Sequence, residues 1–230
     1  MESHMHLLQK SSLFAGISAE EIEKLCTCLA ACEKSVSRGA FVFRAGDDVR
    51  FIYLLLSGSM HIIDEDPWGD CSLIETMSAY TLFGEAYVFA SRKKQLVSVI
   101  AAEDARILEI DPLRLFETCL CGCDCHAKLL RNTLAILSEK IVRLTEKLGH
   151  VAQRSARAKV LSYLSKCARQ EKSCCFEIPY SRQQLADYLC VDRSALSHEL
   201  SKLHKAGIIQ YRKNYFELHT PQENALSSQQ

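Results

Sequence analysis

Hydrophobic positions along this chain follow a strand-like rhythm first and a helical rhythm afterwards. Five of the nine glycines fall between residues 39 and 84, and short runs rich in β-branched and aromatic residues continue to residue 110. The runs are FVFR (41–44), FIYLLL (51–56), SMHII (59–63), CSLIET (71–76), LVSVI (96–100) and ARILEI (105–110). Short strands at this spacing, separated by turn residues, are typical of a jelly-roll barrel.

A helix is predicted ahead of the strands, over residues 18–32. Ser18 is its expected N-cap, and Glu21 completes a capping box. Four apolar residues share one face of this helix: Ile22, Leu25, Leu29 and Cys32. We expect that face to pack against the barrel.

A long helix follows the strands, because there is no proline between Pro112 and Pro179 and the apolar spacing alternates between three and four residues. The apolar positions are Ala127, Leu130, Leu134, Leu137, Ile141, Leu144, Leu148 and Val151. One helix cannot bury such a stripe alone, so the pattern favours a parallel partner from a second chain. The predicted homodimer interface is Leu130, Leu134, Leu137, Ile141, Leu144 and Leu148. The alternative is a single amphipathic helix lying on its own domain.

Residues 181–203 predict two short helices joined by a tight turn. The first covers Arg182–Leu189, with Leu185, Ala186 and Leu189 inward, and Cys190–Val191 form the turn. Asp192 is the expected N-cap of the second helix, whose inward positions are Ala195, Leu196, Leu200 and Leu203. Its outward positions are Arg193, Ser194, Ser197, His198, Ser201 and Lys202, a surface that suits the major groove of DNA.

The flanks of this helix pair predict a winged helix-turn-helix rather than an ordinary surface hairpin of two amphipathic helices. A further helix is expected over residues 155–169, a strand over CCFEIP (174–179), and two strands within GIIQYRKNYFEL (207–218). Charge agrees with a DNA-binding role. Residues 151–213 hold 12 Lys and Arg against 5 Asp and Glu, whereas the whole chain has 28 of each and a net charge of zero. A basic C-terminal part joined to an acidic remainder is expected when one domain neutralises phosphates.

Length and composition predict more than one domain in an α+β chain of 230 residues, 48% hydrophobic. We expect an effector-sensing β-barrel domain over 1–122, a dimerisation helix over 123–150 and a winged helix-turn-helix over 151–230. The chain has neither an apolar stretch of membrane-spanning length nor the apolar core of a signal peptide, so we expect a cytoplasmic protein with reduced cysteines.

Two segments resemble the cyclic AMP receptor protein and fumarate-nitrate regulator (Crp/Fnr) family. LFGEA (82–86) resembles the phosphate-binding cassette of the family's sensor barrel, and RQQLADYLCVDRSALSHEL (182–200) resembles its DNA-reading motif. The resemblance covers nearly the whole chain, and it implies a jelly-roll (cyclic-nucleotide-binding-like) barrel, a long dimerisation helix and a C-terminal winged helix-turn-helix. It further implies a homodimeric transcription regulator in which a small effector repositions two reading helices on a palindromic site of double-stranded DNA. RNA polymerase is then a candidate partner.

The resemblance places the effector site at Phe83, Gly84, Glu85, Gln95 and Leu96. In the family, the positions matching Gly84 and Glu85 hold the cyclic phosphate and the ribose hydroxyl. An Arg ten residues beyond that Glu neutralises the phosphate, but this chain has Gln95 there, followed by Leu96. A neutral amide cannot replace the charge, so cyclic AMP should bind weakly or not at all unless Lys93 or Lys94 substitutes. Glu85 could equally be a barrel-rim carboxylate hydrogen-bonded to nearby backbone.

The same resemblance assigns roles on the DNA side. Arg193 matches the family's principal base-reading arginine, and a bidentate Arg contact to guanine is the commonest specific contact. Ser194 stands where a Glu is usual and His198 where an Arg is usual, so the recognised sequence should differ from that of the best-known members. Ser181, Arg182 and Lys202 are placed for phosphates, with Ser197 also on the DNA-facing surface.

Cysteine-rich CLCGCDCH (119–126) leaves a second interpretation open. Its thiols, with His126, could hold zinc or an iron–sulfur cluster, and other family members carry such clusters or haem, so a redox-, haem- or metal-responsive DNA-binding sensor is the first alternative. Spacing does not fix a ligand set, and Cys119 to Cys125 could simply be packed beside the dimer stripe. A barrel that assembles with other proteins and contacts DNA incidentally is the second alternative. No catalytic signature is present, so we expect no enzyme.

Overall fold

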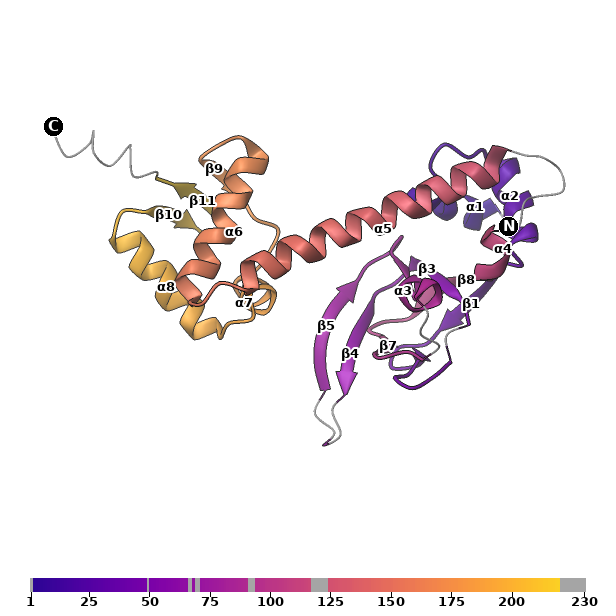
Figure 1. Cartoon of the computed structure of the whole chain (residues 1–230), viewed down its shortest axis with the longest axis horizontal. Helices are drawn as coiled ribbons and strands as arrows, with labels where there is room; N and C mark the ends of the chain where they lie inside the picture. The colour runs from indigo at the N-terminus through magenta and orange to yellow at the C-terminus, as the bar shows by residue number, and fades with distance from the viewer. Residues whose placement is uncertain are drawn as a thin grey trace. The chain divides into compact units, whose positions relative to one another are not determined.

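The structure of the chain is a computed structural model that describes residues 2–48, 50–65, 68, 71–90, 94–116 and 124–219. It divides into two compact units, Met1–Ser138 and Glu139–Gln230. The division falls inside one long helix, α5 (Asp124–Val151), and each unit is described by itself (Figure 1).

The first unit begins with α1 (Glu2–Gln9), the 3₁₀ turn η1 (Ser12–Phe14) and α2 (Ala19–Cys28). The predicted capping box of α2 is confirmed: Ser18 N donates to Glu21 Oε2 at 2.8 Å, and Glu21 N donates to Ser18 Oγ at 3.4 Å. These hydrogen bonds lower the pKa of Glu21, because they favour its charged form. The predicted helix was too long, since Ala30 adopts a positive φ of 46° and the chain then enters a strand, so Cys32 is exposed rather than on the buried face.

Two four-stranded antiparallel sheets follow, which confirms the jelly-roll prediction (Figure 1). One has the order β1 (Cys32–Val36), β8 (Ala105–Ile110), β3 (Ile52–Ser57) and β6 (Leu82–Phe83). The other has the order β2 (Phe41–Phe43), β7 (Ser98–Ala101), β4 (Met60–Glu65) and β5 (Cys71–Met77). Each predicted apolar run overlaps one of these strands to within two residues at its ends, whereas β1 and β6 were not predicted.

The burial of strand β3 on both faces explains why its sequence is a continuous apolar run instead of an alternating one. Ile52, Leu54 and Leu56 face a core formed with the helices, while Tyr53 and Leu55 face the core between the sheets. A strand buried on both faces has no polar face to display.

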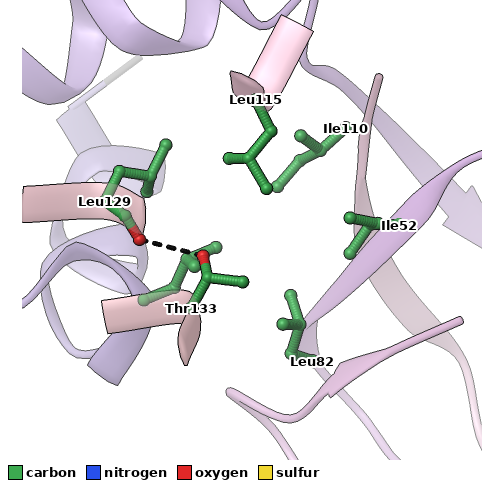
Figure 2. A pocket seen from close by; sticks show the side chains of 7 residues that line it. Ile52, Leu82, Ile110, Leu115, Leu129 and Thr133 are labelled. Carbon is green, nitrogen blue, oxygen red and sulfur yellow. Dashed lines mark hydrogen bonds between the residues drawn. The ribbon is translucent and has the colours of Figure 1, made fainter. Parts of the chain in front are cut away.

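The first turns of α5 complete the helical side of this core. Cys125 and Leu129 are fully buried there, and Asn132 Nδ2 donates to the carbonyls of Leu13 at 3.0 Å and Ala15 at 2.9 Å. A small apolar cavity of about 10 Å³ remains between α5, β3, β8 and the short helix α4 (Pro112–Phe116). Figure 2 shows Thr133 pointing toward it while its hydroxyl donates to the Leu129 carbonyl at 2.9 Å. This volume holds at most about one water molecule, so the cavity is a packing defect rather than a ligand site.

The second unit is the predicted winged helix-turn-helix. Its helices are α6 (Ala156–Glu171), α7 (Arg182–Leu189) and α8 (Arg193–Lys205). Its sheet has the order β10 (Ile209–Arg212), β11 (Tyr215–Leu218) and β9 (Cys175–Glu177), all antiparallel. Among the helices within the described ranges, none combines the length and apolar character needed to cross a membrane.

Candidate functional site

Helix α8 presents the surface that the sequence predicted for DNA. Leu196, Leu200 and Leu203 are buried in the domain core. On the opposite side the structure exposes Arg193, Ser194, Ser197, His198 and Lys202, with Ser201 half-buried. Asp192 holds the N-cap position, but its side chain makes no capping hydrogen bond. The first turn of α8 is thus fixed by the packing of Leu196 and leaves Arg193 and Ser194 free to reach outward.

The turn between α7 and α8 is fixed by contacts that spacing alone did not reveal. Cys190 adopts a left-handed conformation with φ 50° and is exposed. Lys159 on α6 donates from Nζ to the carbonyls of Leu189 at 3.2 Å and Cys190 at 3.1 Å. These carbonyls end α7, where a cation is favoured by the helix dipole. Lys159 is therefore a positioning residue for the helix pair.

Two of the predicted phosphate-contacting residues also have structural roles. Ser181 is the N-cap of α7: its Oγ accepts from Gln184 N at 3.3 Å, and its N donates to Gln184 Oε1 at 2.8 Å. Arg182 is half-buried, with its guanidinium 4.9 Å from the Phe216 ring centre and 5.1 Å from that of Tyr211. Lys202 by contrast is exposed and forms a surface pair with Glu199 at 3.0 Å.

The wing supplies basic residues outside the predicted set. Arg212 and Lys213 are exposed at the turn between β10 and β11, where Lys213 has a positive φ of 54°. The sequence does indicate them, because the RKN turn (212–214) places two basic residues between two apolar strands.

The predicted effector residues lie mostly inside the barrel. Phe83 is buried and stacks on Tyr53 at 5.1 Å between ring centres, and both contact Phe43. Burial raises the pKa of Tyr53 to about 12, with Glu109 and Asp47 adding to the rise. Glu85 starts the short helix α3 (Glu85–Phe89) and is only 4% exposed.

Gly84 is required by its surroundings. Its φ is +80°, and a Cβ there would lie 3.0 Å from Tyr53 Cδ2 and 3.2 Å from the Phe51 carbonyl oxygen. The LFGEA turn therefore needs glycine for steric reasons, whatever it binds.

Gln95 and Leu96 differ sharply in solvent exposure. Gln95 is 2% exposed, its backbone pairs with the 46–47 turn, and its Oε1 is buried with no hydrogen-bond partner within the described ranges. Leu96 is 53% exposed. Of the two lysines considered as substitutes for the missing arginine, Lys94 is exposed and pairs with Asp48 at 2.8 Å, and Lys93 lies outside the described residues.

Helix α5 leaves the predicted dimer stripe largely uncovered within one chain. Leu134, Ile141, Leu144 and Leu148 are 64–68% exposed, while Leu130 and Leu137 are half-buried. The residues that α5 buries against the barrel, Cys125, Leu129 and Thr133, lie at a different set of positions.

The cysteine-rich segment falls mostly outside the described residues, which include neither Cys119, Cys121 nor Cys123. Cys125 and His126 lie in the first turn of α5, and both are buried. No group of three or more His, Cys, Asp or Glu residues could hold a metal in the part of the chain that the structure describes. Cys28, Cys174 and Cys175 are exposed.

A sensor-like jelly roll joined to a winged helix with an exposed polar reading helix defines a DNA-binding regulator. Comparison with protein families agrees with this class. The model of the cyclic nucleotide-binding domain matches residues 33–120, and the model of the Crp-like helix-turn-helix domain matches residues 158–226. The chain belongs to the Crp/Fnr family: it is a Crp/Fnr-type DNA-binding transcription regulator with an effector-binding domain.

Solved structures share the fold at low sequence identity. The catabolite activator protein of Thermus thermophilus is 22% identical with a TM-score of 0.53, covering 95% of this chain and 97% of that one. CLP of Xanthomonas campestris, described as a c-di-GMP responsive global regulator, is 22% identical with a TM-score of 0.58, covering 88% and 100%. CprK in complex with OCPA is 14% identical with a TM-score of 0.61, covering 89% and 93%. No curated protein matches the chain.

Proposed function

We propose that two copies of this chain pair through α5 and read an inverted repeat in double-stranded DNA. The observation that carries the proposal is the exposed stripe of Leu134, Ile141, Leu144 and Leu148 on α5. Large apolar side chains repeating at heptad spacing are unfavourable in water and are covered by a matching helix in coiled coils. A parallel pair of such helices relates two reading domains by a two-fold axis, which a palindromic site mirrors.

In this proposal α8 lies in the major groove. Arg193 reads a guanine, while Ser194, Ser197 and His198 face neighbouring base edges. Ser181 and Lys202 contact phosphates, and the exposed Arg212 and Lys213 of the wing add phosphate contacts beside them. Arg182 reaches phosphate only if its guanidinium leaves the wing aromatics, so we assign it the weakest role of the set.

We further propose that the barrel's effector is not cyclic AMP. A buried, neutral Gln95 stands where the family's cyclic-nucleotide binders carry arginine, and Lys94 is exposed and paired with Asp48. Relatives of this fold are described with different small molecules, c-di-GMP for CLP and OCPA for CprK, so the barrel alone does not fix the effector. The domains we assign are the effector-sensing barrel over 1–122, the dimer helix over 123–150 and the reading domain over 151–230.

Selection of duplexes from a random library by the full-length protein tests the DNA-binding proposal. The expected result is enrichment of an inverted repeat whose half-site centres lie about 34 Å, or one helical turn, apart, followed by a footprint on that site. Enrichment of no repeat, with equal affinity for the selected and random duplexes, would contradict it. The salt dependence of binding to both duplexes separates specific reading from phosphate contact alone.

A further inference from the structure

The last turn of α5 carries a buried histidine that the DNA-reading contacts do not use. Helix α5 stays helical through Gly149 to Val151, and His150 is only 5% exposed. The segment without helix comes later, at residues 152–155. His150 is therefore an anchored side chain, and the chain leaves the helix after it.

Three elements of the reading domain surround His150. Its Nδ1 lies 2.8 Å from the Ser162 hydroxyl on α6. Its ring packs edge-on against Tyr163 of α6 at 5.8 Å and lies 6.3 Å from Tyr188 of α7. Tyr188 in turn stacks on Tyr180, which precedes α7, at 5.1 Å. One imidazole thus joins the end of α5 to both α6 and α7.

The protonation state of His150 is constrained by this geometry. An imidazolium has two N–H donors, but the site offers one partner: Nε2 is buried and has no hydrogen-bond partner among residues 139–219 or elsewhere in the described ranges. Neutral imidazole leaves one ring nitrogen unbonded at modest cost, whereas the cation buries an unsatisfied charged donor. Burial accordingly lowers the pKa of His150, and Lys166 and Arg169 add to the effect.

Charged and titratable side chains surround His150 on the elements packed against it. On α5 they are Glu146, which opposes the shift, and Lys147, whose ammonium lies 5.6 Å from the Tyr188 ring centre. On α6 they are Tyr163, Lys166, Cys167 and Arg169, with Lys166 paired to Glu146. Burial raises the pKa of Tyr188 to about 12 and that of Cys167 above its ordinary value. Histidine is the side chain whose ordinary pKa lies closest to neutral pH, so His150 is the group through which pH can act on this attachment.

We propose that His150 is a positioning residue for DNA reading: as a neutral side chain it fixes the end of α5 to α6 and α7, and its protonation releases this attachment. The inference rests on the proposed function, because the orientation of α7 and α8 matters through the DNA they read. Because the pKa of His150 is lowered while the site is closed, His150 binds a proton more tightly when the site is open. The attachment is therefore stable above the ordinary histidine pKa of about 6.5 and is lost as the pH falls below it.

Hydrogen exchange of the full-length protein without DNA tests the inference directly. Backbone amides of the last turns of α5 and of α6 should exchange up to about tenfold faster at pH 5.5 than at pH 7.5 after correction for intrinsic rates. Peptides of β3 in the barrel should show no such change. His150→Gln, which keeps an amide donor near Ser162 but cannot be protonated, should remove the pH response.

His204 provides the matched control. It lies in the same domain, its Nδ1 is 3.2 Å from the Ile209 carbonyl oxygen, and its ring packs edge-on against Tyr211 at 5.6 Å, but it is exposed. His204→Gln should keep the wild-type pH response. A His150→Gln protein that responds to pH as the wild type does would overturn the proposal.

Proton NMR titration of the wild-type histidines provides a test that needs no variant. A His150 resonance that titrates below pH 6.5 supports the inference, and one that titrates at 6.5 or higher overturns it. Neither hydrogen exchange nor the NMR titration uses DNA. Failure to find an inverted-repeat site would therefore contradict the proposed function without affecting the test of His150.

Discussion

The Arg182 guanidinium donates a hydrogen bond to the backbone carbonyl of Lys213, which joins the first residue of α7 to the turn of the wing. The same group lies over the rings of Tyr211 and Phe216, and burial lowers the pKa of Arg182. An arginine held in this way is part of the wing's packing, although its position at the start of a DNA-reading motif suggests a phosphate contact.

Replacement of Arg182 should therefore act mainly on the stability of the reading domain rather than on DNA binding. Arg182→Ala removes a charge-assisted hydrogen bond and two cation–π contacts, so we expect a loss of about 2–3 kcal/mol in the free energy of unfolding of the reading domain. Urea unfolding followed by circular dichroism measures it. Arg193→Ala, at an exposed position on α8, should change stability little. Equal stability of the two variants would contradict the structural role of Arg182.

Arg193 and Lys202 should affect DNA binding in different ways. Loss of a bidentate contact to guanine in Arg193→Ala should cost about 1–3 kcal/mol on the selected site and relax the preference at one base pair. Loss of a phosphate contact in Lys202→Ala should weaken all duplexes alike and reduce the salt slope by about 1. Titrations on the selected site, on single-base variants and on random duplex distinguish these outcomes. If Arg193→Ala lost the same affinity on every duplex, Arg193 would not read a base.

The reading helix was predictable because its signal is local. Leu196, Leu200 and Leu203 repeat at helical spacing, which alone decides that Arg193 and His198 face outward. Arg182 was different, since its burial depends on a hairpin some thirty residues further along the chain. Such a contact is invisible to periodicity.

Ion pairing and backbone conformation explain the other differences between the predictions from sequence and the structure. Strand β1 has no apolar alternation because Glu33 and Lys34 pair across to Arg106 and Glu109 of β8. Helix α2 was predicted too long because the spacing of Ile22, Leu25 and Leu29 continues by chance to Cys32, beyond the positive φ at Ala30. The exposure of Leu96 likewise depends on where β7 begins, at Ser98, which its apolar run did not mark.

A charge on the α5 stripe should abolish the proposed dimer. Ile141→Lys places an ammonium at the centre of the stripe, where a coiled-coil partner would bury it, so sedimentation should give a monomer at micromolar concentration. Val142→Lys is the matched control, because Val142 is also a β-branched residue exposed on α5, at 50% against 64% for Ile141, but lies outside the stripe, at a flanking position where coiled coils commonly carry lysine. The dimer interpretation would fail if both variants sedimented as the wild type does.

Cyclic nucleotides provide a test at Gln95. The wild-type protein should show no rise in melting temperature with millimolar cyclic AMP or cyclic GMP, because the position that would neutralise the phosphate is a neutral amide. Gln95→Arg should melt at a lower temperature without ligand, since it buries a charge, and should gain a rise on adding cyclic AMP. A clear rise in the wild type would overturn the assignment, and a wild-type response lost in Lys94→Ala would identify Lys94 as the substitute.

Gly58, between β3 and β4, should tolerate no side chain. Its φ is +85°, and a Cβ there would lie 2.6 Å from the Asp104 carbonyl oxygen and 2.8 Å from Ala105 Cα, both backbone atoms. Gly46 has a similar φ of +90° but nothing within 4 Å of the added Cβ, so Gly46→Ala should lose only the conformational term of about 1–2 kcal/mol. Gly58→Ala adds a displacement of β8 relative to β3 and should lose clearly more in urea unfolding of the full-length protein. Equal losses of stability in Gly58→Ala and Gly46→Ala would show that the backbone conformation alone requires glycine. The contact with the 104–105 backbone would then relax without a cost in free energy.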